Sequence, residues 1–230
     1  MGKVVLVGSQ KCDIGKTTLC IKAGYQLSQM GKKVLILDLS LGNKKISDYL
    51  NVSENIIYDI KDVFDGICSL DQAIIDINEN LQLLPSPRLK DKLKDVKFEL
   101  FSSLIKEAKD YDVIIADVDK ISLSYIDFND ITNIVTVNNN DFSSIKEISL
   151  DKTVAQKNNV AITTIINKFS KRDAKKGSML SAKDIQKMTE LNINAVIDEN
   201  LAYDGSHDFL TNAQDNSFNK AINIILNQIN

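Results

Sequence analysis

The stretch GSQKCDIGKTTLC, residues 8 to 20, gathers the residue types that bind phosphate. It follows the apolar run Lys3–Val7 and closes with GKTT at positions 15 to 18, so a strand should enter it and a helix should leave it. A loop in that place turns backbone N–H groups and the positive end of a helix toward an anion. Lys16 would reach the β- and γ-phosphates of a nucleotide, and Thr17 would offer its hydroxyl to Mg²⁺. The pattern predicts a nucleotide-binding loop; the alternative is a polar turn without a ligand.

Two further side chains would complete such a site. Asp117 ends the apolar run YDVIIAD, and a carboxylate at the carboxyl end of a parallel strand can hold Mg²⁺ through water beside the loop. The alternative for Asp117 is an aspartate that caps a turn or a helix. Asn167, in the stretch INKF, carries both a donor and an acceptor and therefore matches the edge of an adenine base. The competing interpretation of Asn167 is a turn residue at the end of a strand.

The composition is that of an ordinary globular protein. The 230 residues are 43% hydrophobic and 26% charged, and a net charge of −3 with a pI near 5.3 gives no general attraction to nucleic acid. No run approaches the roughly 18 apolar residues that cross a bilayer, and the N-terminus lacks a signal-peptide pattern. The spacing of Cys12, Cys20 and Cys68 suits neither a disulfide framework nor a zinc site. We expect a cytoplasmic location and no nucleic-acid partner.

Short apolar runs alternate with helical patterns along the chain. The expected strands are Lys3–Val7, Lys33–Leu37, Leu81–Leu84, Val113–Ala116, Asn133–Val137, Ala161–Ile166 and Ala195–Ile197. The expected helices are Thr17–Met30, Lys90–Lys109, Ser143–Lys157, Ser181–Leu191 and a last one from about Ser217. This order predicts an α/β fold whose mostly parallel sheet is covered by helices on both faces. No Pro-rich linker divides residues 1–230, so we expect a single domain. The basic run at 171–176 is interpreted as an exposed loop, with a contact to a partner or to phosphates as the alternative, and His207 is interpreted as a surface residue.

Lys11 sets the loop apart from an ordinary phosphate loop. A lysine five residues before Lys16 marks the deviant Walker A loop, and with it the chain resembles the MinD/ParA family of dimerising P-loop ATPases, closest to the MinD branch. Further stretches resemble MinD segments in their order and spacing: VLILDLSLGNKKISDYL (switch I), YDIKDVFDGICSLDQAI, NLQLLPSPRLKDK, YDVIIAD (Walker B), INKF, KKGSMLSAKDI and INAVIDENLAY. The resemblance covers the chain nearly end to end and implies a P-loop NTPase fold.

The resemblance implies ATP or ADP with Mg²⁺ as ligands, an ATP-dependent homodimer and a regulatory protein as partner. Lys11 would reach across the dimer to the nucleotide of the second copy. The residues implied to contact the nucleotide are Lys11, Cys12, Asp13, Ile14, Gly15, Lys16, Thr17, Thr18, Asn167, Ile197, Asp198 and Glu199. Those implied in catalysis are Lys11, Lys16, Asp38 and Ser40, and those implied in metal binding are Thr17 and Asp117.

The chain departs from the family pattern at positions that matter for hydrolysis. Gln10, Cys12 and Asp13 stand where the loop has glycines, which predicts backbone strain, and the aspartate would repel phosphates. Ser40 replaces the second switch I aspartate, which positions or activates the attacking water in the family. The stretch ADVDKIS replaces the switch II pattern Asp-x-Pro-x-Gly, so Ile121 stands where a glycine would meet the γ-phosphate. Because phosphoryl transfer depends on positioning and charge, we expect ATP binding with weak or absent hydrolysis.

The last stretch, SFNKAINIILNQIN, differs from the basic amphipathic helix with which the family binds membranes. Its apolar face consists of Phe218, Ala221, Ile222, Ile225 and Ile229. Lys220 is its only charge, whereas a helix on a membrane surface carries Lys and Arg along its polar face. We therefore expect this helix to dock on the core of the domain, and membrane binding is doubtful.

These features favour a MinD-like, ATP-binding positional switch that dimerises with nucleotide and is at most a slow ATPase. One alternative is a non-hydrolysing scaffold of the kind that localises pilus assembly, which would bind no nucleotide. The other is a ParA-like partitioning protein, which would need a nucleotide-dependent basic surface for DNA. The acidic balance of the chain argues mildly against that second alternative.

Overall fold

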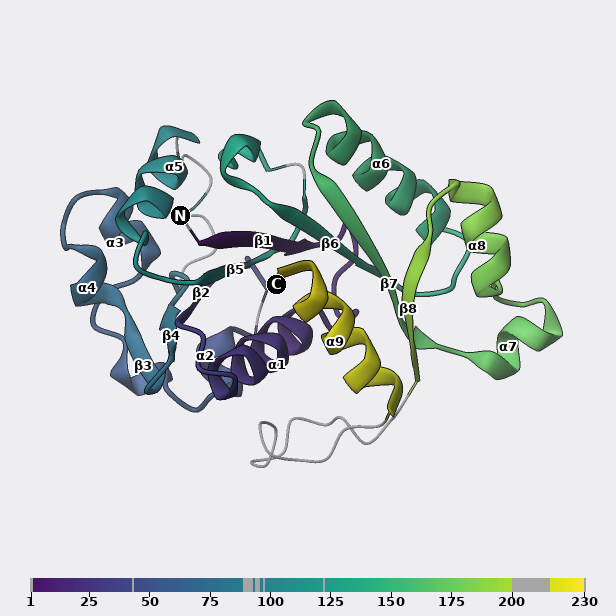
Figure 1. Cartoon of the computed structure of the whole chain (residues 1–230), viewed down its shortest axis with the longest axis horizontal. Helices are drawn as coiled ribbons and strands as arrows, with labels where there is room; N and C mark the ends of the chain where they lie inside the picture. The colour runs from purple at the N-terminus through teal and green to yellow at the C-terminus, as the bar shows by residue number, and fades with distance from the viewer. Residues whose placement is uncertain are drawn as a thin grey trace.

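The computed structural model describes residues 2–42, 44–88, 93, 96, 98–121, 123–199 and 216–229. Within these residues eight strands form one sheet in the order β3-β4-β2-β5-β1-β6-β7-β8 (Figure 1). The strands are β1 (Lys3–Gly8), β2 (Val34–Leu39), β3 (Ile75–Asn78), β4 (Leu81–Leu84), β5 (Val113–Val118), β6 (Asn133–Asn138), β7 (Ala161–Phe169) and β8 (Ile193–Asp198). All pairings are parallel except that of β3 with β4. The expected mostly parallel sheet is confirmed.

Helices cover both faces of this sheet, as Figure 1 shows. The described helices are α1 (Lys16–Gln29), α2 (Ile46–Tyr49), α3 (Ile60–Phe64), α4 (Leu70–Ala73), α5 (Phe98–Glu107), α6 (Ser144–Lys157), α7 (Lys171–Lys176), α8 (Ala182–Thr189) and α9 (Asn216–Ile229). Side chains of α1 and α9 share one core layer with the sheet, and those of α3, α4 and α5 share the layer on the opposite face. A smaller cluster joins α6 and α8 to β7 and β8.

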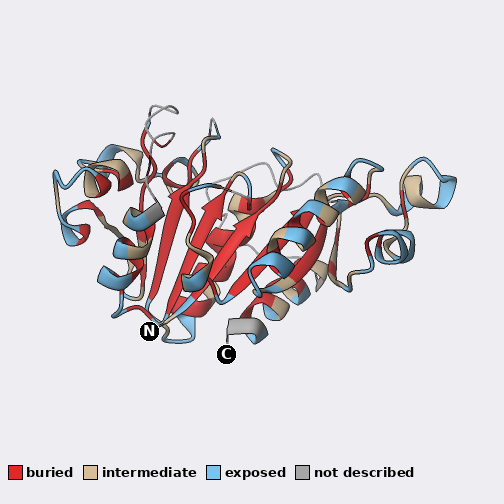
Figure 2. Cartoon of the chain, turned by 90° about the horizontal axis from the view of Figure 1, so that it is seen from above, coloured by how far each residue is buried: buried red, intermediate tan, exposed pale blue. Residues whose placement is uncertain are grey.

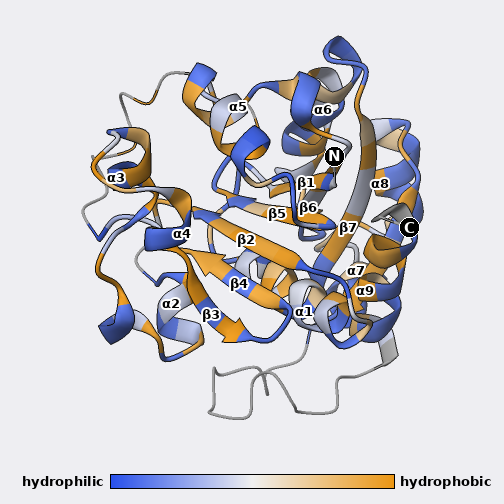
Figure 3. Cartoon of the chain, turned by 60° about the vertical axis from the view of Figure 1, so that its left-hand side comes forward, coloured by the Kyte–Doolittle hydropathy of each residue, from blue (hydrophilic) through white to orange (hydrophobic). Residues whose placement is uncertain are grey.

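The central strands are buried along their whole length, because helices cover both of their faces. Every described residue of β2, β5 and β6 is buried, and Figure 2 shows the middle of the sheet as an almost continuous buried layer. Such strands need no alternation of polar and apolar residues, which is why their sequences are near-continuous apolar runs. In Figure 3 the strands are mostly hydrophobic, whereas the helices carry hydrophilic stretches on their outer sides. The core therefore lies on both sides of one sheet.

Strand order determines where a ligand can bind. β1 and β6 are neighbours, but the chain leaves β1 toward β2 on one side of the sheet and leaves β6 toward β7 on the other side. In open parallel sheets, a crevice forms at the carboxyl ends of the strands where the order reverses. The loop at residues 9–15 follows β1 at this position, and β5 ends beside it at Asp117 and Val118.

Several elements differ from the sequence-based expectation. The edge strand β3 was not expected, since Ile75–Asn78 is short and only partly buried. The basic run 171–176 is helix α7 rather than loop; the Ser170 side chain accepts from Asp173 N at its start, and Gly177 ends it with φ of 75°. β2 extends two residues further than expected, to Leu39. Of the expected helix 90–109 the structure describes Phe98–Glu107 as helical, and His207 lies outside the described residues.

The last helix packs against the body of the protein, as expected. Phe218, Ala221, Ile222, Ile225 and Leu226 are buried, in the same cluster as α1 and the residues of β8 that face it. The side chain of Ile229 lies outside the described residues. In the part of the chain that the structure describes, no helix is both long and apolar enough to cross a membrane.

We expect Ile222→Ala to lower the free energy of unfolding by about 2–5 kcal/mol, because it leaves a cavity under α9 where the native side chain is 1% exposed. Urea denaturation followed by circular dichroism measures this change, with Lys220→Ala, on the exposed side of the same helix, as the control. A loss no larger than that of the control would show that α9 does not contribute to the core.

Candidate functional site

The loop between β1 and α1 has fewer strained residues than its missing glycines predict. Of its three non-glycine replacements only Asp13 has a positive φ, of 55°, and aspartate tolerates that conformation better than most residues. Gln10 and Cys12 keep negative φ, so the expected strain is absent there. Gly15 has φ of 88°, and a Cβ on it would lie 2.4 Å from Nδ2 of Asn167. Glycine is therefore required at position 15 for both conformation and space.

Lys16 and Thr17 lie at the start of α1, at the end of this loop. Nζ of Lys16 donates to the carbonyl oxygen of Lys11 at 2.6 Å, so its amine spans the loop from one side to the other. The Lys16 residue is only 7% exposed. Oγ1 of Thr17 donates to Oδ2 of Asp117 at 2.7 Å, which joins the helix start to the end of β5. The fold thus brings together the sequence-predicted trio of Lys16, Thr17 and Asp117, although Thr17 and Asp117 are 100 positions apart in the sequence.

Asp117 is a fully buried carboxyl group with one unused oxygen. Its Oδ1 finds no hydrogen-bond partner among the described residues. Burial, and then the charge of Asp38 on the adjacent strand, raise the pKa of Asp117 to about 7. A cation beside it would relieve both penalties. The described residues hold no group of three or more His, Cys, Asp or Glu side chains that could hold a metal ion. The oxygens of Asp117 and Thr17 are of the donor type that Mg²⁺ takes from proteins, alongside water and phosphate.

Asp38 serves the backbone of switch I in this structure. Its Oδ1 accepts from the amide and the hydroxyl of Ser40, at 3.1 and 2.7 Å, and its Oδ2 accepts from the amide of Ile46 at 2.9 Å. Nζ of Lys45 donates to the carbonyl of Ser40. Burial raises the pKa of Asp38, and these hydrogen bonds oppose that rise. The Ser40 hydroxyl is therefore directed at Asp38 rather than left to hold a water.

Lys11 is held by the start of α6 in its own chain. Its Nζ donates to Asn139 Oδ1 at 2.7 Å, to Asp141 Oδ1 at 2.5 Å and to Ser144 Oγ at 3.1 Å. Glu147 Oε2 lies 3.7 Å from the same amine. Although burial opposes it, the Lys11 amine is the main reason why the pKa of Asp141 lies well below its usual range. The lysine expected to reach a second copy is thus hydrogen-bonded and ion-paired within the single chain.

The other residues predicted to contact nucleotide lie in the loop, at the start of α1 and toward the carboxyl ends of β7 and β8. Nδ2 of Asn167 donates to the carbonyl of Ile14 at 2.7 Å, so this amide supports the loop. Cys12 is exposed, whereas Thr18 is partly buried on α1. Ile197 is 1% exposed in the core cluster that contains Ile14. Asp198 pairs with Lys171, and Glu199 is exposed beyond the end of β8.

Sequence reasoning missed a polar chain beneath the loop. Nε2 of Gln10 lies 3.5 Å from Oδ1 of Asp151, and Oδ2 of Asp151 accepts from Thr136 at 2.5 Å. Asn138 continues the chain to Thr136 and to Ser9, whose Oγ accepts from the amide of Lys11. Gln10 therefore replaces a glycine with a side-chain anchor rather than simply crowding the loop. The sequence signal that could have indicated this polar chain is Asp151, a charged residue on the buried face of α6.

Ile121, at the switch II glycine position, lies in the core. It is fully buried, and a Cβ added to Gly8 would lie 2.7 Å from its Cγ1. A side chain so placed helps anchor switch II under the end of β1. Position 121 therefore contributes packing where the family pattern has a residue that meets phosphate.

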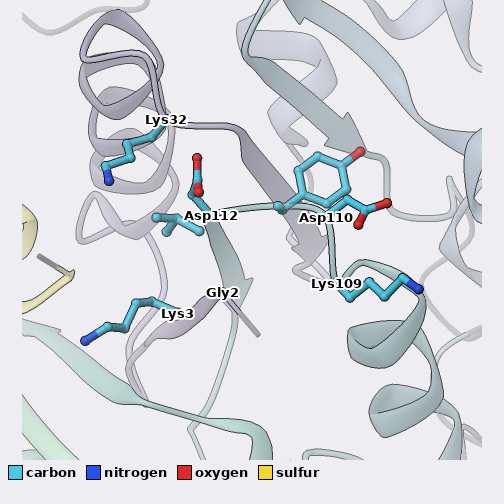
Figure 4. Close-up of a pocket in the computed structure, with 8 residues that line it drawn as sticks. Gly2, Lys3, Lys32, Lys109, Asp110 and Asp112 are labelled. Atoms are coloured by element: carbon cyan, nitrogen blue, oxygen red, sulfur yellow. The ribbon is translucent and has the colours of Figure 1, made fainter.

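A hollow lies at the end of the sheet opposite the loop of residues 9–15. About 390 Å³ in volume, it is lined by Gly2, Lys3, Lys32, Lys109, Asp110, Tyr111, Asp112 and Val113. Figure 4 shows that Lys109 points away from Lys3 and Lys32, so the three amines do not converge on one ligand. This hollow lies at the amino ends of β1 and β5, and the chemistry of the chain is concentrated at their carboxyl ends.

Comparison with known proteins identifies the family. The family model for the AAA domain matches residues 2–144. The septum site-determining protein MinD of Buchnera aphidicola is 30% identical over 217 residues, which cover 86% of this chain and 79% of that protein. The chain belongs to the MinD/ParA family of P-loop ATPases.

Two solved structures of this family share the fold. A chain of the MinC:MinD cell division protein complex of Aquifex aeolicus has a TM-score of 0.82 and 23% identity, covering 98% of this chain and 96% of that chain. The septum site-determining protein MinD of Pyrococcus horikoshii, complexed with Mg-ADP, has a TM-score of 0.81 and 21% identity over the same shares. The α/β P-loop fold expected from the sequence is confirmed.

Asp151 should make stability depend on pH. Burial raises its pKa to about 6, above the value of about 3.9 in an unfolded chain. The folded state therefore keeps the proton more tightly, and this contribution to stability is lost as the pH rises from 4 through 6. Relative to wild type, Asp151→Asn should gain about 1–3 kcal/mol in the free energy of unfolding between pH 4.5 and pH 7.5. Urea denaturation at both pH values tests this, with exposed Asp110→Asn as the control. If the free energies of unfolding of Asp151→Asn and wild type differ by the same amount at both pH values, the prediction is wrong.

Cys12 should be the first thiol to react with a soluble alkylating agent. Cys12 is exposed, whereas burial raises the pKa of Cys20 and that of Cys68, the latter with help from Asp62. Saturating Mg-ATP should slow the reaction of Cys12 and leave that of Cys68 unchanged, because phosphates would fill the space in front of the loop. Peptide mapping by mass spectrometry after brief exposure measures both rates. Faster labelling of Cys68 would overturn this placement of Cys12.

Proposed function

We propose that the chain is a MinD-like switch that binds Mg-ATP at the loop of residues 9–18 and dimerises in response. The observation that carries this proposal is the trio of Lys16, Thr17 and Asp117, in which the Asp117 oxygen without a partner lies beside the loop. Lys16 would face the β- and γ-phosphates, and Thr17 with Asp117 would hold Mg²⁺. The Mg-ADP bound to MinD of Pyrococcus horikoshii supports the same ligand class here.

The contacts of Lys11 suggest how nucleotide would control dimerisation. In the single chain its amine is satisfied by Asp141, Asn139 and Ser144. To contact a nucleotide in a second copy, Lys11 must leave these partners, which costs the energy of a partly buried ion pair. The charge of a triphosphate compensates this cost better than that of a diphosphate. Dimerisation would therefore depend on ATP, with the start of α6 as the resting position of Lys11.

Hydrolysis in this switch would be slow. The Ser40 hydroxyl is engaged with Asp38, and Ile121 is packed in the core instead of meeting the γ-phosphate. Loss of groups that position water reduces turnover more than binding. The loss of these groups also favours the second candidate, a non-hydrolysing scaffold, which would bind no nucleotide. A regulatory protein is the proposed partner in either case, since a MinD is found with MinC in the Aquifex aeolicus complex.

Two lysine substitutions separate binding from dimerisation. Lys16→Ala should abolish binding of Mg-ATP and its non-hydrolysable analogue, because it removes the main charge facing the phosphates. Lys11→Ala should bind the analogue within about threefold of wild type but fail to dimerise, since its amine points to α6 in the single chain. Isothermal titration calorimetry measures binding and sedimentation velocity measures dimerisation, with exposed Lys187→Ala as the control.

Normal nucleotide binding by Lys16→Ala would show that the loop is not the site. A wild-type protein that binds the analogue but stays monomeric would contradict the switch, whereas a wild-type protein that binds no nucleotide would favour the scaffold. Dimerisation of Lys11→Ala as strong as that of wild type would remove Lys11 from the mechanism while leaving nucleotide binding intact.

A further inference from the structure

Switch II carries a carboxylate at the point where switch I has lost one. The family pattern Asp-x-Pro-x-Gly, read along ADVDKIS, places proline at the position that Asp119 occupies here. Asp119 is the first residue after β5, and Ser40 is the first residue after β2. The chain therefore has an unexpected acid in one switch segment and lacks an expected acid in the other.

Strand register places these two positions side by side. β2 and β5 are parallel neighbours in which Asp38 is opposite Asp117 and Leu39 is opposite Val118. The next pair in the same register is Ser40 and Asp119. A parallel pair of strands separates opposite residues by about 4.8 Å, a distance that one carboxylate side chain spans. The carboxylate of Asp119, directly after β5, can thus reach the space that the carboxylate of an aspartate at position 40, directly after β2, would occupy.

The contacts of Asp119 agree with that placement. Its Oδ2 accepts from the amide of Leu41 at 2.6 Å, so the side chain crosses from switch II to the residue after Ser40. The residue is partly exposed, unlike Asp38 and Asp117, which are fully buried. No described residue donates to Oδ1, so this oxygen remains to accept from a water.

We propose that Asp119 is a catalytic residue that holds the attacking water for ATP hydrolysis, in place of the switch I aspartate that Ser40 replaces. This proposal rests on the proposed binding of Mg-ATP at the adjoining loop. Oδ2 would keep switch I in place through Leu41, while Oδ1 would accept a hydrogen bond from the water and orient its lone pair. The chain would then retain slow turnover despite Ser40.

The step itself is ordinary hydrolysis of the γ-phosphoryl group. The water oxygen forms a bond to the γ-phosphorus, and the bond from that phosphorus to the bridging oxygen of ADP breaks. The bridging oxygen keeps the electron pair, and the proton released by the water passes to an oxygen of the departing phosphate. ATP and water thus give ADP and inorganic phosphate, and Asp119 is unchanged at the end of the cycle.

The competing interpretation is that Asp119 only caps the turn of switch I. Asp119→Asn distinguishes the two roles, because an amide oxygen still accepts from Leu41 while the other atom becomes a donor, which cannot accept from water. Asp127→Asn is a matched control, since Asp127 also accepts from a backbone amide, that of Asn129 at 3.0 Å, in the same connection between β5 and β6. Asp119→Ala additionally removes the bond to Leu41 and measures what the cap alone contributes to stability.

Phosphate release and the melting temperature are measured on wild type and on each variant of the full chain. Calorimetry gives the affinities for a non-hydrolysable Mg-ATP analogue, for Mg-ADP, and for Mg-ADP with aluminium fluoride, a mimic of the transferring phosphoryl group. We expect Asp119→Asn to reduce turnover at least about tenfold and to lose the tighter binding of the mimic over Mg-ADP. Its affinity for the ATP analogue and its melting temperature should match those of Asp127→Asn.

Turnover and mimic binding of Asp119→Asn equal to those of wild type would overturn the proposal and establish the cap. A wild-type protein that binds the analogue but neither turns over nor prefers the mimic would also overturn it, with the proposed nucleotide site intact. Absence of analogue binding in wild type would refute the proposed function itself. If Asp119→Asn melts at a lower temperature, the ratio of its affinities for the mimic and for Mg-ADP distinguishes the catalytic role from the cap. A general loss of folded protein lowers both affinities alike and leaves this ratio unchanged.

Discussion

The in-register parallel pairing of β5 with β1 on one side and β2 on the other is the constraint on which the site depends. Because these strands run in the same direction, their carboxyl ends meet at one edge of the sheet. The register opposes Val7 to Asp117 and Asp117 to Asp38, so a buried carboxyl group lies directly beside the beginning of the loop. A shift of one residue in either pairing would turn Asp117 to the other face of the sheet and separate it from Thr17.

This arrangement buries negative charge before any ligand is present. Asp38 and Asp117 are both fully buried on neighbouring strands, and burial raises the pKa of each. Asp38 is compensated by backbone amides and by the hydroxyl of Ser40, whereas among the described residues Asp117 accepts from the Thr17 hydroxyl at one oxygen, with the Lys16 amine nearby. The difference gives the two acids different tasks: the first holds switch I in shape, and the second is left with an unsatisfied oxygen that favours a cation.

Side-chain hydrogen bonds hold this loop in place, at positions where the family pattern has glycine and in the residues next to them. Gln10 is joined to Asp151, the amide of Lys11 to Ser9, and the carbonyl of Ile14 to Asn167. Such bonds hold a loop in one conformation at the cost of buried polar groups that must all be satisfied. Only Gly15 could not be replaced in this way, because Asn167 occupies the space next to it. These bonds stabilise the loop although side chains stand at three of the positions where the family pattern has glycine.

The sequence by itself determined seven of the eight described strands and the five longest described helices, the loop and its two lysines, and the family to which the chain belongs. These features are local: the apolar runs of the central strands and the spacing of Lys11, Lys16 and Thr17 are visible within about 20 residues. Only the tertiary structure decided the partners of those residues. Lys11 contacts Asp141 across 130 positions, Thr17 contacts Asp117 across 100, and Asp119 meets Leu41 across 78. Such contacts depend on strand order and register, which are set by burial of the whole sheet, so no short pattern could specify them.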